Sequence, residues 1–291
     1  MKISLPILAL ALLTLCRASA QVVSVEIVLD QNQFLPSETL PVAVRITNRS
    51  GQVLHLGADP DWLTFSVESE DGFIVTKNSE VPVLGEFDLG SSEVATKRVD
   101  LQPYFDLKRQ GHYRVTATLR IKDWNRHVSS APKGFDVVSG AELWSQDFGM
   151  PVPPGATNRA PEIRKYTLEE ANYLRQQLRM YVMVGDQSGS RVFKVSAIGP
   201  MVSFSRPEPQ LDHFSNLHVI YQSGARTFTY SVVSPDGKIV RQDIYDYLDK
   251  RPRLGLNEAG EIVVIGGVRR VKPAELPLVK LPDELTPPAK H

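Results

Sequence analysis

Cysteine is almost absent from this chain, since Cys16 is the only one among its 291 residues. It lies in an N-terminal segment that we expect to be removed, so the mature chain is expected to carry no thiol. Disulfides, thiolate metal sites and cysteine nucleophiles are thereby excluded from the mature protein. An exported protein without disulfides depends on apolar burial, which suits a bacterial periplasm or exterior.

Long apolar runs are missing after the first residues. Residues 3–15 are largely apolar, but this run is shorter than the about 20 residues that a spanning helix needs. Lys2 precedes the run and Ala18-Ser19-Ala20 follows it, which is the arrangement of a secretory signal peptide. We predict a signal peptide over residues 1–20, a periplasmic or extracellular protein, and no transmembrane segment.

The mature chain is expected to begin at Gln21. A lipoprotein is the alternative, because Leu13-Thr14-Leu15-Cys16 ends on the cysteine, although the residue before a lipidated cysteine is normally small. The intact mass of the exported protein checks this prediction. We expect the mass of a chain that begins at Gln21, and the mass of a chain that begins at a lipidated Cys16 would contradict the prediction.

An excess of charge of one sign is also missing. The chain has 33 basic and 33 acidic residues, and removal of Lys2 and Arg17 with the signal peptide leaves a net charge of about −2. Neither a nucleic-acid partner nor a polybasic membrane patch is expected. A hydrophobic content of 42% indicates a folded chain, which is long enough for two domains.

Residues 21–140 show the alternation of apolar and polar residues that is typical of strands. The clearest example is residues 113–121, in which Tyr113, Val115 and every second residue after them are apolar. About seven such strands, separated by turns such as Asn48-Arg49-Ser50-Gly51, predict an antiparallel β-sandwich.

This segment resembles the Ig-like domains of bacterial secreted proteins in residues 34–38 before Pro41-Val42-Ala43-Val44, in the strand end at residues 46–51, and in Gly111-His112-Tyr113-Arg114-Val115. The last segment is similar to a tyrosine corner, in which the phenol bonds to the backbone upstream. The resemblance implies an Ig-like sandwich, without the Cys-Trp-Cys core of antibody domains. A weaker resemblance, to a small bacterial proteinase-inhibitor sandwich, rests on residues 48–61, 65–67 and 71–72.

The second half is predicted to begin with a linker and to end with a tail, both rich in proline. Residues 141–165 are assigned as the linker because of the prolines between residues 151 and 161, and residues 271–291 as an extended tail. Thr167-Leu168-Glu169-Glu170 is a capping-box pattern and predicts a short helix to about Leu178.

The rest of residues 166–270 is predicted to form antiparallel hairpins. Strand-like pairs flank turns at residues 186–189, 222–224 and 257–260. We predict a single antiparallel β domain, with a fragment of a propeller-like meander as the alternative, because the segment is too short for a closed propeller. The overall fold class is therefore mainly β with one short helix.

The candidate residues for hydrolytic catalysis are Asp212, His213 and Ser215, which lie close together in a polar segment. Neighbours in sequence rarely have the geometry of a nucleophile and its base, and no Gly-x-Ser-x-Gly elbow occurs in the chain. The preferred interpretation is that these residues hydrogen-bond their own turn, so that no catalytic residue is predicted.

No metal or cofactor is predicted. The six histidines are not at helical or zinc-finger spacing. Calcium on Asp59, Asp61 and Asp71 is the alternative, but they do not form an Asp-x-Asp-x-Asp-Gly loop, and turn aspartates are preferred. The histidines are His55, His112, His127, His213, His218 and His291.

Aromatic residues give the predicted ligand-binding site. Trp124 lies in a polar segment beside Arg126, where an exposed indole could stack on a sugar or a peptide, and Trp62 is a second candidate. The alternative is that a loop tryptophan packs over the edge of the core.

These observations favour a non-enzymatic exported binding or scaffold protein of the bacterial cell envelope, with a protein or glycan partner. The alternatives are a secreted hydrolase with a site at the domain junction and a proteinase inhibitor carried by the Ig-like domain. Strongly shifted carboxylate or histidine pKa values lining one cleft would favour the hydrolase. A deep pocket in which several ionisable groups from distant stretches of the chain converge on one point would overturn the first interpretation.

Overall fold

A computed structural model of the protein describes residues 22–151, 162–174 and 177–272. The predicted signal peptide with Cys16, most of the predicted tail and residues 152–161 of the predicted linker lie outside this part of the chain. The chain divides into two compact units between Val137 and Val138, called unit 1 and unit 2 below.

The described residues are almost entirely strands and loops, which confirms the mainly β prediction. Their helical segments are two short 3-10 turns, η1 (Gln102–Tyr104) and η2 (Lys122–Trp124). No helix in the described part is long and apolar enough to cross a membrane.

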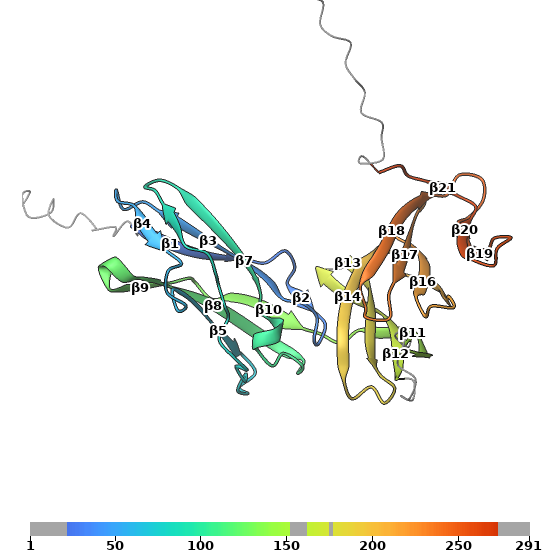
Figure 1. The fold of residues 1–291 in the computed structure, drawn as a ribbon, viewed down its shortest axis with the longest axis horizontal. Helices are drawn as coiled ribbons and strands as arrows, with labels where there is room; N and C mark the ends of the chain where they lie inside the picture. The colour runs from blue at the N-terminus through green and yellow to red at the C-terminus, as the bar shows by residue number, and fades with distance from the viewer. Residues whose placement is uncertain (1–21, 152–161, 175–176, 273–291) are drawn as a thin grey trace, which may run out of the picture. The chain divides into compact units, whose positions relative to one another are not determined.

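Unit 1 contains two main sheets (Figure 1). One has the order β1-β3-β7, and the other has the order β2-β10-β8-β5 with β9 also paired to β8. All pairs are antiparallel except β2 with β10. The bounds are β1 (Val23–Val28), β2 (Gln33–Phe34), β3 (Pro41–Asn48), β4 (Leu54–Leu56), β5 (Leu63–Ser69), β6 (Phe87–Leu89), β7 (Val94–Asp100), β8 (Gly111–Ile121), β9 (Arg126–Ser129) and β10 (Lys133–Val137), of which β4 and β6 form a separate pair.

The two sheets of unit 1 bury their apolar faces in one shared core. Val44 from β3 and Val115 from β8 are both fully buried in it. Alternate residues of β8 from Tyr113 to Ile121 are buried, which confirms the alternation seen in the sequence. The Tyr113 hydroxyl donates to the carbonyl of Arg109, as the tyrosine-corner pattern predicts, and the Tyr113 ring stacks on Phe135.

Unit 2 contains two larger antiparallel sheets and one separate hairpin. The sheets have the orders β11-β12-β13-β14 and β15-β16-β17-β18-β21, and the hairpin is β19-β20. The bounds are β11 (Ala141–Gly149), β12 (Ile163–Leu174), β13 (Gln177–Asp186), β14 (Val192–Met201), β15 (Glu208–Leu211), β16 (Leu217–Gln222), β17 (Thr227–Val233), β18 (Ile239–Asp246), β19 (Arg253–Leu256), β20 (Ile262–Ile265) and β21 (Val268–Arg269).

The predicted helix from Thr167 is wrong, because its residues belong to β12. Thr167 pairs with Ser145 of β11 on one side and Met183 of β13 on the other, and Leu168 is fully buried in the core between the sheets. A capping box expresses only a local preference, and pairing on both sides together with burial overrides it.

The predicted linker over residues 141–165 is also wrong in the part that the structure describes. Residues 141–149 form β11, and β12 begins at Ile163. The prolines on which the linker prediction rested lie between or beside these two paired strands.

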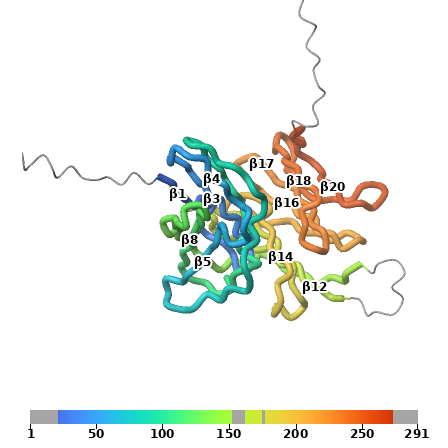
Figure 2. Tube along the Cα trace, turned by 60° about the vertical axis from the view of Figure 1, so that its left-hand side comes forward, coloured from blue at the N-terminus to red at the C-terminus, as the bar shows by residue number. Residues whose placement is uncertain are grey.

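The two central strands of the sheet β15-β16-β17-β18, β16 and β17, are buried on both faces. Leu217, Val219 and Tyr221 of β16 pack into the core shared with β11 to β14. On the other face, Ile220 and Tyr230 form a second apolar cluster, against which residues of the β19-β20 hairpin pack. The hairpin lies beside β16 in both views (Figures 1 and 2). The mainly apolar sequence of β16, interrupted by His218, agrees with burial on both faces.

Candidate functional site

Trp62 is a core residue, so its prediction as an exposed binding residue is wrong. Its side chain is 2% exposed, its Nε1 donates to the Val83 carbonyl at 2.8 Å, and its ring meets Phe87 edge-on. Trp62 lies just before β5, so the alternation of buried and exposed side chains within that strand does not decide on which side the Trp62 side chain lies. A buried indole N–H that finds a carbonyl partner is typical of a packed tryptophan.

Trp124 and Arg126 lie on either side of Asn125, which has a left-handed backbone with φ 46°. Trp124 is partly buried and packs against the core of unit 1, whereas Arg126 is exposed. This contact gives Trp124 a packing role, and a binding role for the pair stays a prediction.

The aspartates weighed for calcium make other contacts. Asp61 pairs with Arg120, Asp59 pairs with Lys122 at 3.2 Å, and Asp71 accepts a hydrogen bond from the His112 amide at 2.7 Å. No group of three or more histidine, cysteine or acidic side chains suited to a metal occurs among the described residues.

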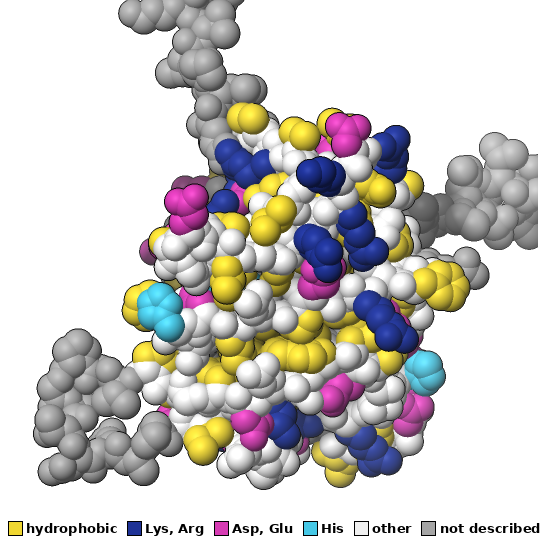
Figure 3. Space-filling view, turned by 90° about the vertical axis from the view of Figure 1, so that its right-hand side faces the viewer, with side chains coloured by type: hydrophobic (Ala, Val, Ile, Leu, Met, Phe, Trp, Pro, Cys, Tyr) yellow, Lys and Arg dark blue, Asp and Glu magenta, His cyan; other side chains and the backbone are white. Residues whose placement is uncertain are grey.

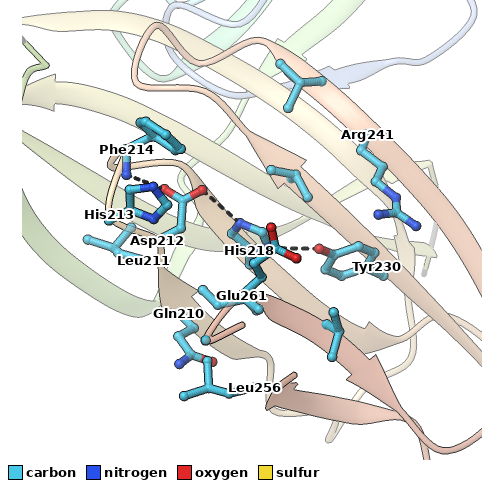
Figure 4. Close-up of a pocket in the computed structure, with 15 residues that line it drawn as sticks. Gln210, Leu211, Asp212, His213, Phe214, His218, Tyr230, Arg241, Leu256 and Glu261 are labelled. Carbon is cyan, nitrogen blue, oxygen red and sulfur yellow. Dashed lines mark hydrogen bonds and ion pairs between the residues drawn. The ribbon is translucent and has the colours of Figure 1, made fainter. Parts of the chain in front are cut away.

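A pocket of about 510 Å³ lies in unit 2, between one face of the sheet β15 to β18 and the β19-β20 hairpin (Figure 4). We call it the Asp212 pocket. Its lining residues are Gln210, Leu211, Asp212, His213, Phe214, His218, Tyr230, Val232, Val240, Arg241, Leu256, Gly260, Glu261, Ile262 and Val263.

Three polar side chains, of which His218 and Tyr230 are buried and Asp212 is partly buried, form a chain of hydrogen bonds at the floor of the Asp212 pocket. His218 Nε2 lies 3.2 Å from Asp212 Oδ2, and His218 Nδ1 lies 2.8 Å from the Tyr230 hydroxyl. His218 and Tyr230 are 9% and 2% exposed. A neutral imidazole with its proton on Nε2 donates to the carboxylate and accepts from the phenol, so one tautomer satisfies both contacts.

The Asp212 carboxylate also holds its own turn, as the preferred interpretation of this segment predicts. It accepts hydrogen bonds from the amides of Phe214 at 2.9 Å and Asn216 at 2.8 Å, and from Asn216 Nδ2 at 2.9 Å. The Ser215 hydroxyl donates elsewhere, to the Gly149 carbonyl at 2.9 Å, and the His213 ring lies against Phe214. Asp212, His213 and Ser215 therefore form no triad.

Burial and hydrogen bonding fix the charge states of the floor. Burial alone would raise the pKa of Asp212, but the hydrogen bonds from Asn216, His218 and Phe214 outweigh it and hold this pKa below its ordinary value. Burial raises the pKa of the Tyr230 phenol. At neutral pH the floor thus holds a carboxylate beside a protonated phenol.

The other charged side chains of the pocket are already partnered. Arg241 pairs with the buried Asp243 at 2.6 Å and lies over the Tyr230 ring at 5.5 Å, and Glu261 accepts a hydrogen bond from Asn257 at 2.9 Å.

The rim of the Asp212 pocket exposes three large apolar side chains. Phe214, Val240 and Leu256 are 60%, 60% and 58% exposed. The arrangement offers an apolar surface above a polar floor whose hydrogen bonds are internal.

A smaller pocket of about 210 Å³ on the sheet β11 to β14 contains a pair of carboxylates. Glu142 and Glu169 are cross-strand partners of β11 and β12. Burial, and then the charge of Glu142, raise the pKa of Glu169. A carboxyl with a raised pKa beside a second carboxylate is one feature that the hydrolase alternative predicts, and this pair lies within unit 2.

Comparisons with known proteins do not assign the chain to a family. No family model matches the chain, and no curated protein matches it. Among solved structures, the crystal structure of Spo0M, a sporulation control protein from Bacillus subtilis, is similar with 11% sequence identity and a TM-score of 0.31. The match covers 69% of this chain and 79% of Spo0M. A similarity of this extent carries no argument about function.

Proposed function

We propose that the chain is a non-enzymatic binding protein exported to the bacterial cell envelope, and that the Asp212 pocket holds an apolar side chain of a partner protein. One observation carries the proposal: the polar groups of the floor bond to one another, while Phe214, Val240 and Leu256 stand exposed around them. Binding an apolar group here removes apolar surface from water and breaks no hydrogen bond. A glycan would need free polar groups for its hydroxyls, so a protein partner fits better.

The floor is poorly suited to acid-base catalysis. A general base needs a lone pair that can reach the substrate. Both ring nitrogens of His218 already have hydrogen-bond partners inside the protein, Asp212 Oδ2 for Nε2 and the Tyr230 hydroxyl for Nδ1. The raised pKa of Tyr230 also keeps its phenol from acting as a nucleophile at neutral pH. These three groups give the loop at Asp212 a fixed shape, which supports a binding role.

Unit 1 is proposed to be the Ig-like β-sandwich that the sequence predicts. Its two sheets share one core, and the Tyr113 hydroxyl bonds to the backbone four residues upstream. Both features support this assignment.

Selection of displayed peptides on the mature protein tests the proposal. We expect enrichment of peptides with a leucine, isoleucine or phenylalanine anchor, and about tenfold weaker binding to the variants Phe214→Ser and Leu256→Ser. Phe204→Ser is the matched control, since Phe204 is a fully exposed phenylalanine of the same unit outside the lining of the pocket. Equal binding by all three variants, or selection without apolar anchors, would contradict the proposal.

A hydrolase is the second candidate, and the carboxylate pair Glu142 and Glu169 favours it. The same selected peptides separate the two functions. A binding protein leaves them intact after prolonged incubation, whereas a peptide hydrolase releases fragments that mass spectrometry detects. If the wild-type protein releases peptide fragments and the variant Glu169→Gln does not, the hydrolase replaces the binding protein as the proposed function.

A further inference from the structure

A second pocket of unit 2, of about 590 Å³, has four cations among its eight lining residues. It contains Arg206, Lys250, Arg251 and Arg253, and one acidic residue, Glu208. We call it the basic pocket. Figure 3 faces the side on which β19 and β20 lie in Figure 1, and it shows a group of Lys and Arg side chains in the upper half of that face. The formal charge of the pocket lining is +3, from four cations and one carboxylate.

The four cations of the basic pocket are not neutralised within the described part of the chain, where none of them forms an ion pair. Glu208 directs its Oε2 to the Leu254 amide at 3.3 Å. Two other arginines of unit 2 are paired, Arg241 with Asp243 and Arg270 with Asp246. The basic pocket therefore brings four cations without an ion pair together in one hollow.

The backbone of the basic pocket is held in place without a ligand. The Gly267 amide donates to the Lys250 carbonyl at 2.9 Å. Gly266 has φ +77°, and a Cβ there would lie 2.8 Å from the Arg251 carbonyl oxygen, so the two segments need glycine to pack this closely. The Arg251 guanidinium lies over the Phe228 ring at 5.3 Å. Such preorganisation lowers the entropic cost of ordering the site when a ligand binds.

We propose that the basic pocket binds the phosphate group of a phosphorylated ligand. Guanidinium groups present a planar fork of donors that matches a phosphate, and a lysine adds a point charge. A formal charge of +3 suits a phosphate dianion better than a single carboxylate. This site is distinct from the Asp212 pocket and does not depend on the function proposed for it.

The position of the basic pocket along the β19-β20 hairpin adds a geometric argument. Arg253 pairs with Ile265 at one end of the hairpin, and Leu256 pairs with Ile262 at the other. Three residues of strand span about 10 Å. The basic pocket and the apolar residue Leu256 thus lie within the length of one lipid molecule. The phosphate group can therefore belong to the headgroup of an anionic lipid, and a free phosphorylated compound is the other source to be tested.

Two binding measurements distinguish these sources. Calorimetric titration with inorganic phosphate detects a soluble ligand site, and cosedimentation with vesicles that contain phosphatidylglycerol, against pure phosphatidylcholine vesicles, detects a headgroup site. We expect binding in at least one arm, about tenfold weaker in the double variant Lys250→Gln/Arg253→Gln. Added salt should weaken it further, because the site is open to solvent.

The control is the double variant Arg49→Gln/Lys238→Gln, which removes the same charges from exposed positions outside the basic pocket. Arg206→Gln, in the loop before β15, is a second test variant that leaves the hairpin untouched. Thermal unfolding confirms that each variant is folded. No binding in either arm, or equal binding by the test and control variants, would overturn the proposal, whereas a titration that depends on the pocket cations supports it.

Discussion

Replacing Tyr166 by alanine is expected to lower the free energy of unfolding of unit 2 by about 4 kcal/mol. Tyr166 is fully buried, and its ring stacks on Phe148 at 4.2 Å. Its hydroxyl lies 3.1 Å from the Ser215 carbonyl oxygen and 3.2 Å from that of Val233, so its one proton is shared between these two acceptors. The substitution therefore leaves a cavity and frees two carbonyls. One of these belongs to the loop that carries Asp212.

The variant Tyr166→Phe separates these two effects. It keeps the ring and removes the hydroxyl, so we expect a loss of about 1 kcal/mol. Hydrogen exchange of the β16 amides measures the stability of unit 2 alone. A loss below about 1 kcal/mol for Tyr166→Ala would show that this side chain is not a central packing residue.

The second large effect is expected at Asp243, whose replacement by alanine should cost about 2 kcal/mol. Its carboxylate is 3% exposed and accepts from Arg241 at 2.6 Å and Lys272 at 3.0 Å, with Arg269 at 3.5 Å. Removal leaves these cations together without their counter-charge. All three cations are partly exposed, so solvent screening keeps the loss below that of a fully buried pair.

The pH dependence of stability tests the same carboxylate. Burial alone would raise the pKa of Asp243, but hydrogen bonds from Arg241 and Lys272 hold it below the ordinary value. The folded state therefore favours the ionised form, and this contribution is present above the ordinary pKa of about 4. It is lost as the pH falls through the lower pKa of the folded state.

The variant Asp243→Asn should flatten this loss of stability in acid. Unfolding by urea, repeated from neutral pH to below the ordinary carboxyl pKa, gives the two stability curves. Curves of the same slope for wild type and variant would show that the carboxylate is not stabilised by its cations.

The strands of unit 1 could be predicted because their pattern is simple. In β8, one face is buried from Tyr113 to Ile121, and the alternation of apolar and polar residues expresses that directly. The phenol contact of Tyr113 was predictable for a similar reason, since it joins residues only four positions apart.

β12 could not be predicted from its own residues. Thr167 and Glu170 favour a helix start locally, whereas the strand is specified by pairing with β11 and β13. The sequence of one segment does not show which strands will pair with it. Trp62 was misassigned for a related reason, because a residue just outside a strand does not follow the alternation inside it.

The floor of the Asp212 pocket was only partly visible in the sequence. Asp212 was correctly expected to bond its own turn, but the histidine that it contacts is His218, in the middle of an apolar strand. The pairing of β16 with β17 places Tyr230 opposite Ile220, on the same face as His218. An imidazole inside an apolar strand was the available signal, and its partners depend on the register. The structure thus gathers more ionisable groups in one pocket than the sequence led us to expect.

Chemical-shift mapping with a selected peptide tests the central claim most directly. When an apolar-anchored peptide is added to the isotope-labelled mature protein, we predict that the amide signals of Phe214, His218, Leu256 and Ile262 move together and saturate with one affinity. Shifts confined to unit 1, around Trp124 and Arg126, would contradict the claim that the Asp212 pocket is the binding site.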